Sequence, residues 1–290
     1  MKLIVKFNLV FFAVFLVGLG VAGAISYNLL QRNAREEILQ HARIMMEAAL
    51  AQRAYTNTQV APLLETQMRY KFLPQSVPAY SATEMFNKLR ATFTDYSYKE
   101  ATLNPTNPRD RATDWEADIV HQFRNGQATT EVIGERDTPT GRALYLARPI
   151  QIKDQACLRC HSTVDAAPQT MIDYYGTANG FGWQLNEVVG AQVVSIPTAV
   201  PVARANQAFR VFMLSLTGVF VLIFIALNLM LASIVIKPVT QLAALADQVS
   251  LGNLDVAGFP ATGNDEIGAL AAAFGRMHKS LAKAMSMLES

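Results

Sequence analysis

Two cysteines and a histidine form the most chemically specific pattern in this sequence. Cys157, Cys160 and His161 are arranged as C-x-x-C-H, and the chain of 290 residues has no other cysteine. Two thiols at this spacing can form thioethers with the vinyl groups of a haem, and the imidazole that follows can bind its iron. The pattern predicts a covalent haem c with Cys157 and Cys160 as anchors and His161 as the proximal iron ligand.

Three other uses of these cysteines are weaker. A structural zinc site needs four ligands, and no second cysteine or Cys/His pair exists to complete one. A thioredoxin-like pair requires a strand-to-helix setting and gives the following histidine no role. A disulfide between Cys157 and Cys160 would close a very small loop and stabilise the fold little.

The composition limits the class of protein. The formal net charge is +2, 51% of the residues are hydrophobic, and the mean hydropathy is +0.18. Nucleic-acid binding would require a clustered basic face, so we expect no nucleic-acid partner. No nucleophile, base and orienting group stand together in the sequence, so we expect no enzyme.

Two uncharged stretches explain the hydropathy. Residues 7–31 and 211–236 each exceed the roughly 20 apolar residues that cross a bilayer as a helix. The first could instead be a cleaved signal peptide, since Lys2 and Lys6 make a basic start. Its length and its lack of a convincing cleavage site favour a retained span.

The haem motif decides the expected orientation. Lys2, Lys6 and Lys237 favour the cytoplasm, although Arg32 and Arg35 blur the charge bias. Covalent haem attachment takes place outside the bacterial inner membrane. We therefore expect a cytoplasmic start (1–6), a first span (7–31), a periplasmic domain (32–210), a second span (211–236) and a cytoplasmic remainder (237–290), with both termini in the cytoplasm.

The periplasmic part should begin with a helix. Residues 32–58 contain no Gly or Pro and should continue the first span as a helix that closes near Pro62. Ile38, Ala42, Met45 and Ala49 recur at four-three-four spacing. This short apolar repeat suits either a partner helix or the domain's own core.

The rest of the domain mixes helices and strands. Capping boxes, in which a hydroxyl and a carboxylate satisfy the first helical amides, are expected at Ser81–Glu84 and Thr113–Glu116. Alternating patterns predict strands near 96–101, at 130–133, at 143–152 and at 190–197. The haem motif falls between the last two strands. This order predicts an α+β domain of the PAS-like type.

Residues 237–290 should form two amphipathic helices. The second helix should open at Asp265 after a connector that ends near Gly263. It carries a heptad repeat that neither helix can bury alone, so we expect a dimeric four-helix bundle. The residues of this repeat are Ile267, Leu270, Phe274, Met277, Leu281, Ala284 and Leu288.

Pro238, Leu242, the glycine turn at Gly252 and the Asp265-Glu266-Ile267-Gly268 opening resemble a HAMP linker. HAMP linkers follow a transmembrane helix in bacterial receptors, so the resemblance implies signal transfer to an output module. No kinase, cyclase or methyl-accepting segment follows in the sequence. We therefore expect a separate cytoplasmic output protein, such as a kinase.

The region from about 40 to 200 resembles the c-type haem, PAS-like sensor domains that precede HAMP linkers in cyanobacteria and proteobacteria. The resemblance implies a homodimeric receptor that responds to redox state or to a diatomic ligand such as NO or CO. One such family member uses a cysteine thiolate as its second iron ligand. Both cysteines of this chain belong to the attachment motif, so that ligation is not available here. The resemblance is carried by Tyr55-Thr56, Val60, Pro62-Leu63, Pro74–Pro78, Leu103–Pro108, Trp115-Glu116, the C-x-x-C-H motif, Gly180–Trp183 and Glu187–Gly190.

The second axial ligand is the open question of the site. Thioether and imidazole suit haem iron, and Met68 is our prediction because it follows the expected turn at Pro62. Met45 and Met46 come next, and an open or water-filled position is a serious rival. The other candidates are His41, Met85, His121 and Met171. Of these, we expect His121 to be a solvated helix residue.

Together these features predict a membrane-anchored haem c sensor of redox state or gas. Its dimer contacts would lie in HAMP and in the Arg32–Thr58 helix. The alternatives are a membrane-tethered monohaem electron carrier, whose partner would be a redox protein, and an accessory subunit of a membrane complex. The HAMP repeat favours the sensor, because an electron carrier needs no HAMP linker.

Overall fold

The computed structural model describes residues 2–256, 258 and 265–288. The chain divides into two compact units. One unit comprises Asn28–Ala208, and the other comprises Met1–Tyr27 together with Phe209–Ser290. We name them after the resemblances in the sequence, as the sensor unit and the membrane–HAMP unit.

The helical region at the start of the chain extends further than predicted. Helix α1 runs over Leu3–Tyr55, a π-helical turn η1 covers Thr56–Val60, and α2 follows over Ala61–Met68. The expected end near Pro62 is therefore wrong. Proline has no N–H and collides with the carbonyl four residues earlier. The π turn accommodates the proline, because the Ala61 N–H bonds to the Thr56 carbonyl, and the α-helix then resumes as α2.

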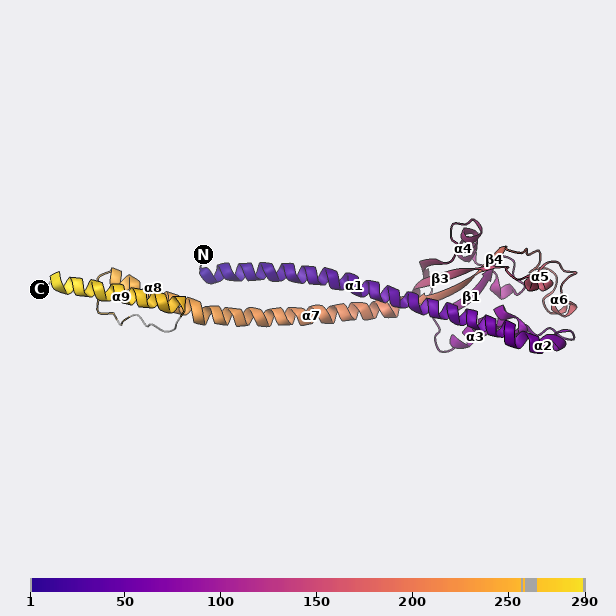
Figure 1. The fold of residues 1–290 in the computed structure, drawn as a ribbon, viewed down its shortest axis with the longest axis horizontal. Helices are drawn as coiled ribbons and strands as arrows, with labels where there is room; N and C mark the ends of the chain where they lie inside the picture. Colours follow the sequence, from indigo (N-terminus) through magenta and orange to yellow (C-terminus); the bar gives the residue numbers. More distant parts are fainter. Residues whose placement is uncertain (1, 257, 259–264, 289–290) are drawn as a thin grey trace. The chain divides into compact units, whose positions relative to one another are not determined.

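Four antiparallel strands form the sheet of the sensor unit (Figure 1), and their order is β1-β4-β3-β2. Ser97 of β1 lies opposite Ser195 of β4, and Val132 of β2 lies opposite Ala147 of β3. All four predicted strands are present, although β2 begins later and runs further than expected. Their bounds are Ser97–Thr102 (β1), Val132–Thr138 (β2), Gly141–Gln151 (β3) and Val188–Pro197 (β4).

One face of this sheet is covered by α1 and by α3 (Pro78–Leu89). Ile38, Ala42, Met45 and Ala49 are all buried here, against residues such as Leu144 and Val194. The apolar repeat of α1 therefore packs on its own domain. Its interpretation as a contact with a partner helix is wrong for this face, because the sheet already fills it.

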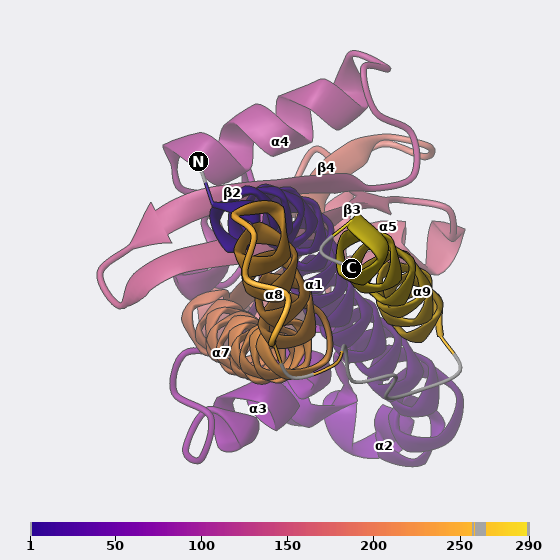
Figure 2. The ribbon, with the colours of Figure 1, turned by 90° about the vertical axis from the view of Figure 1, so that its left-hand side faces the viewer.

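Helix α4 (Asp114–Arg124) covers the opposite face, where Ile119, Val120 and Phe123 pack on strand residues such as Ala147. Figure 2 shows α4 and α3 on opposite sides of the sheet. Successive side chains of a β-strand point to opposite faces of the sheet, so the same strands contribute to the hydrophobic core on each face. The capping box predicted for α4 is confirmed, since Thr113 and Glu116 satisfy each other's backbone amides.

The capping box predicted at Ser81 is wrong. Helix α3 begins at Pro78, three residues earlier, because proline fits the first turn of a helix, where its missing N–H is not needed. Ser81 lies inside the helix, and its hydroxyl accepts a hydrogen bond of 2.6 Å from the Gln52 amide.

The connection from β3 to β4 contains short helical segments, and two further 3-10 turns lie earlier in the unit. The segments of the connection are η4 (Gln155–Cys157), α5 (Leu158–His161) and α6 (Gln169–Tyr175), and the earlier turns are η2 (Pro74–Ser76) and η3 (Pro108–Asp110).

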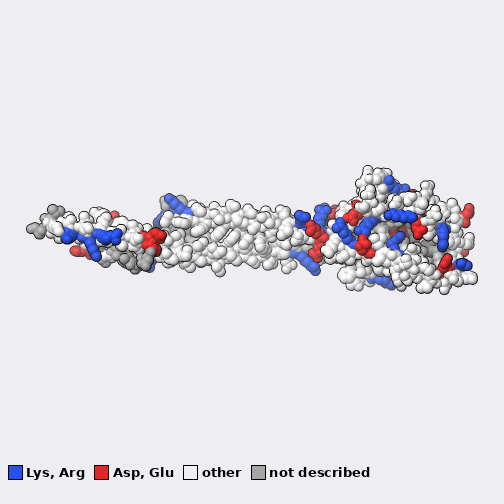
Figure 3. Space-filling model, viewed as in Figure 1, with Lys and Arg blue, Asp and Glu red and all other residues white. Residues whose placement is uncertain are grey.

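Among the described residues, two helices that run through the membrane–HAMP unit are long and apolar enough to cross a membrane. The first part of α1 packs beside α7 (Ala199–Met230), where the rings of Phe15 and Phe220 stack with centroids 4.9 Å apart. Figure 3 shows the uncharged surface of these apolar helices. A second π turn, η5 (Leu231–Ile236), precedes Pro238, which repeats the arrangement before Pro62.

Helices α8 (Lys237–Ser250) and α9 (Glu266–Leu288) form the predicted helical pair. The Asp265 carboxylate accepts a 2.8 Å hydrogen bond from the Gly268 N–H, so Asp265 caps α9. Within α9, the apolar residues Leu270, Met277 and Leu281 are 45%, 52% and 44% exposed. The end of the predicted connector, near Gly263, lies outside the described residues.

Candidate functional site

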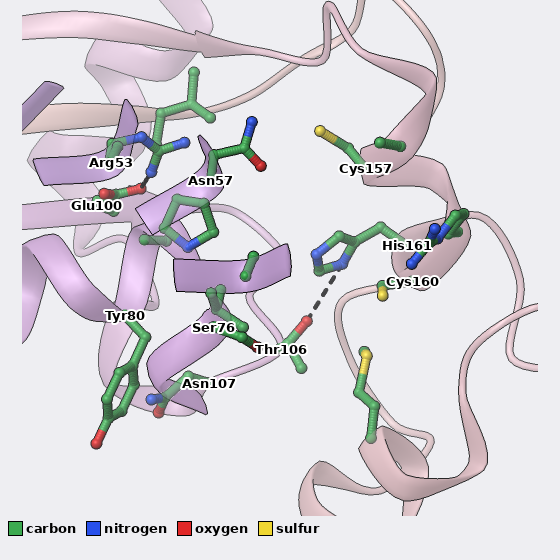
Figure 4. Close-up of a pocket in the computed structure, with 18 of the residues that line it drawn as sticks. Arg53, Asn57, Ser76, Tyr80, Glu100, Thr106, Asn107, Cys157, Cys160 and His161 are labelled. Carbon is green, nitrogen blue, oxygen red and sulfur yellow. Dashed lines mark hydrogen bonds and ion pairs between the residues drawn. The ribbon is translucent and has the colours of Figure 1, made fainter. Parts of the chain in front are cut away.

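A cavity of about 730 Å³ lies in the sensor unit, within the size range of cofactor sites. Its walls include Cys157, Cys160, His161 and Met68, so the four predicted site residues border one space. Figure 4 shows Asn57 and Ser76 on one side, and Cys157, Cys160 and His161 on the other. The fold thus brings together residues from α1–α2 and from the β3–β4 connection.

The two thiols are held on a short helical turn. Asp154 starts this turn, because its carboxylate accepts a 2.8 Å hydrogen bond from the Ala156 N–H. Cys157 and Cys160 are free and half-buried. Burial raises the pKa of both thiols, and the negative charge of Asp154 adds to this effect at Cys157.

His161 has a fixed orientation. Its Nδ1 lies 2.7 Å from the Gly180 carbonyl oxygen, and its ring stacks on Trp183 with centroids 3.9 Å apart. A carbonyl can only accept, so Nδ1 carries the hydrogen and Nε2 keeps its lone pair. Burial lowers the pKa of His161, which favours the neutral ring. Such an imidazole is a ready ligand for a metal ion.

A loop around Gly180 supports this histidine. The Trp183 N–H bonds to the His161 carbonyl at 3.1 Å, and the Asn104 side chain bonds to Gly180 and Phe181, each at 3.2 Å. Gly180 has a φ of +88°, and a Cβ there would overlap Thr106. Glycine is required because the loop must approach Thr106 closely.

Met68 lies at the end of α2 and borders the cavity. Its sulfur accepts hydrogen bonds from the Leu73 N–H at 3.1 Å and from the Ser76 hydroxyl at 3.4 Å. The Met68 carbonyl accepts a 2.9 Å bond from Thr170, which joins α2 to α6. Met68 therefore stabilises the cavity wall through hydrogen bonds to its sulfur and to its backbone carbonyl.

The other proposed distal residues are distributed differently. Met45, Met46 and Met85 belong to the α1–α3 core, and His41 and His121 are exposed on their helices, as expected for His121. Of these candidates only Met171, which is 2% exposed, also borders the cavity.

A partly buried ion pair lies in the cavity wall. Arg53 of α1 pairs with Glu100 of β1, and the Tyr98 hydroxyl donates to the other Glu100 oxygen at 2.8 Å. Nearby, burial raises the pKa of Asp110 to about 6, although the positive charge of Arg109 opposes this rise. Charged groups therefore connect the cavity to the first helix and the sheet.

Sequence reasoning did not single out Arg53 or Asn57, both of which border the cavity. A usable signal was present, since Pro62 within a helical pattern predicts a distortion about four residues earlier. Asn57 lies in that distortion. No comparable local signal marks Arg53, because its partner Glu100 is 47 residues away.

The chain was compared with known proteins. A comparison with curated proteins finds no match. A solved structure titled "Crystal structure of the cyanobacterial heme-protein Tll0287" is 17% identical to this chain, with a TM-score of 0.43. The match covers 56% of this chain and 95% of that chain.

Two family models also match. Residues 230–283 match the HAMP domain, a region that begins at the last residue of α7 and includes α8 and most of α9. Residues 31–197 match the Tll0287-like family, and this region is more than half of the chain. The chain therefore belongs to the Tll0287-like family, and a HAMP domain follows its sensor unit.

Proposed function

We propose that this chain is a membrane-anchored receptor that holds a covalent c-type haem in its sensor unit. In this proposal residues 32–210 form a periplasmic, PAS-like domain, residues 7–31 and 211–236 cross the inner membrane, and residues 237–290 form a cytoplasmic HAMP domain. The family is named for Tll0287, which is described as a heme-protein. That description supports a haem here as well.

The fixed ring of His161 is the observation that carries the proposal. The Gly180 carbonyl holds Nδ1, Trp183 holds the ring plane, and Nε2 remains available on a cavity that both cysteines border. These groups fit a haem attached through Cys157 and Cys160 with His161 as the proximal ligand. A bound haem would supply an iron whose redox state or small-molecule ligand can change.

The chain connects this cavity to the first apolar helix directly through α1, and to the second through the sheet, because β4 lies between the cavity-lining strands β1 and β3. Arg53 belongs to α1, which also contains the first apolar stretch, and β4 ends at Pro197 just before α7. A ligand or electron can shift such a receptor only through different affinities for two conformations. We propose that the HAMP helices, paired with those of a second copy, pass this shift to a separate output protein.

Covalent attachment is tested by producing the full chain in a bacterium with a c-type cytochrome maturation system. After denaturing electrophoresis, the parent should keep a haem stain, and the Cys157→Ser/Cys160→Ser variant should lose it. Ser162→Ala, which is next to the motif, is the matched control and should stain like the parent. A parent chain without stain would disprove the haem c assignment.

Signalling is tested by crosslinking in membranes. If both native cysteines carry haem, a Leu281→Cys variant contains one free thiol on the exposed side of α9. The yield of bismaleimide-linked dimer should change when the haem is reduced or exposed to CO. A yield that is identical in every haem state would favour the electron carrier over the sensor.

A further inference from the structure

The wall that faces the cysteine motif contains an irregular helical turn. Pro62 cannot donate a backbone hydrogen bond, and η1 shifts the chain into π-helical bonding over Thr56–Val60. Thr56 is completely buried, and its hydroxyl donates to the Gln52 carbonyl at 2.9 Å. The turn is thus anchored at the residue immediately before Asn57.

Asn57 borders the cavity with an exposed side chain. In the part of the chain that the structure describes, no hydrogen bond involves its carboxamide. Figure 4 shows this side chain on the helix side of the cavity, in the same space as Cys157 and the His161 ring. Asn57 therefore offers two N–H donors and a carbonyl oxygen to whatever lies beside His161.

The cavity-lining residues closest to Asn57 in the sequence offer no iron ligand of the usual kind. Ala54, Ala61 and Pro62 border the cavity beside Asn57, and none of their side chains has a donor atom for a metal. Met68 is the nearest candidate in sequence, but its sulfur already accepts bonds from Leu73 and Ser76. A carboxamide is not among the usual axial ligands of haem iron, whereas it is a good hydrogen-bond donor.

We propose that the iron position opposite His161 is open and binds a small neutral diatomic molecule, to which Asn57 donates a hydrogen bond. The inference rests on the proposed haem site and makes it more specific. It selects a ligand-binding receptor over one that senses redox state through two fixed protein ligands. It also replaces Met68, our sequence prediction, with an open position.

The test uses the full-length holoprotein in detergent, with CO as the probe. The ferrous parent should be five-coordinate and high-spin, and it should bind CO. Asn57→Ala and the bulkier Asn57→Leu should raise the C–O stretching frequency and change CO dissociation about two- to tenfold, since each loses one hydrogen bond. Asn107→Ala is the matched control, because Asn107 also borders the cavity but accepts a bond from the Arg109 N–H.

The outcomes separate this inference from the haem proposal. Loss of the haem stain in the parent would overturn both. A stained parent that is six-coordinate and low-spin without CO, and becomes five-coordinate in Met68→Ala or Met171→Ala, would overturn only the open position. CO binding with the same stretching frequency in the parent and both Asn57 variants would overturn the role of Asn57.

Discussion

Two helices of this chain carry similar apolar repeats in different surroundings. On α1, the residues Ile38, Ala42, Met45 and Ala49 are at most 9% exposed, because the sheet covers them. On α9, Leu270, Met277 and Leu281 are 44–52% exposed, because α8 covers only part of the helix. The first repeat stabilises a single chain, whereas the second stays exposed and, in our proposal, is buried by another copy of the chain.

The largest effect should come from a substitution in the buried repeat of α1, which tests the difference between the two repeats. Ile38→Ala should lower the stability of the sensor unit by about 2–5 kcal/mol, since it leaves a cavity in the core. Both tryptophans, Trp115 and Trp183, lie in this unit, so tryptophan circular dichroism during heating reports on it alone. Ile44→Ala is the control, because Ile44 is 58% exposed on the same helix. Equal melting temperatures of the two variants would contradict the burial of the α1 repeat by the sheet.

The exposed repeat should respond through association instead of folding. Leu281→Asp should weaken the dimer by about 3 kcal/mol, or about a hundredfold in dissociation constant, since it places a charge in an apolar contact. Sedimentation of the full chain in detergent measures this change, with Ser280→Asp as the neighbouring control. The melting of the sensor unit should stay the same. A dimer as tight as that of the parent would mean that this face of α9 is not the interface.

A half-buried carboxylate, Asp110, and exposed carboxylates extend the comparison. The pKa of Asp110 is raised from 3.8 to about 6, so between these values the folded chain binds more protons than the unfolded chain. The free energy of unfolding therefore falls as pH rises through this window. Asp110→Asn should stabilise the sensor unit by about 1–2 kcal/mol above pH 6 and have little effect below about pH 4. Melting curves across this range test the sign, with the exposed Asp118→Asn as control.

The smallest effect should come from the exposed carboxylate Asp265. Asp265→Ala removes the acceptor of the Gly268 N–H and should cost α9 about 0.5–1 kcal/mol. Hydrogen exchange at the Gly268 amide measures this loss. Asp265→Asn keeps a side-chain oxygen and should retain most of the protection. Unchanged exchange in the alanine variant would show that the cap contributes nothing.

Local patterns were enough to predict much of this protein. The strand alternations, the Thr113–Glu116 capping box, the two apolar helices and the Asp265 start of α9 all depend on neighbouring residues. The C-x-x-C-H spacing likewise brings its three side chains to one cavity, because a short helical turn holds them.

Other features depend on residues that are distant in the sequence. The sheet, and not the spacing, determines which apolar repeat of the two is buried. The sulfur of Met68 is engaged by Leu73 and Ser76, and Asn57 lies on a cavity whose other wall begins about 100 residues later. Sequence alone determined the chemistry that the cysteine motif can perform. Only the tertiary structure decided which side chains face that motif, because folding brings α1–α2 and the β3–β4 connection around one cavity.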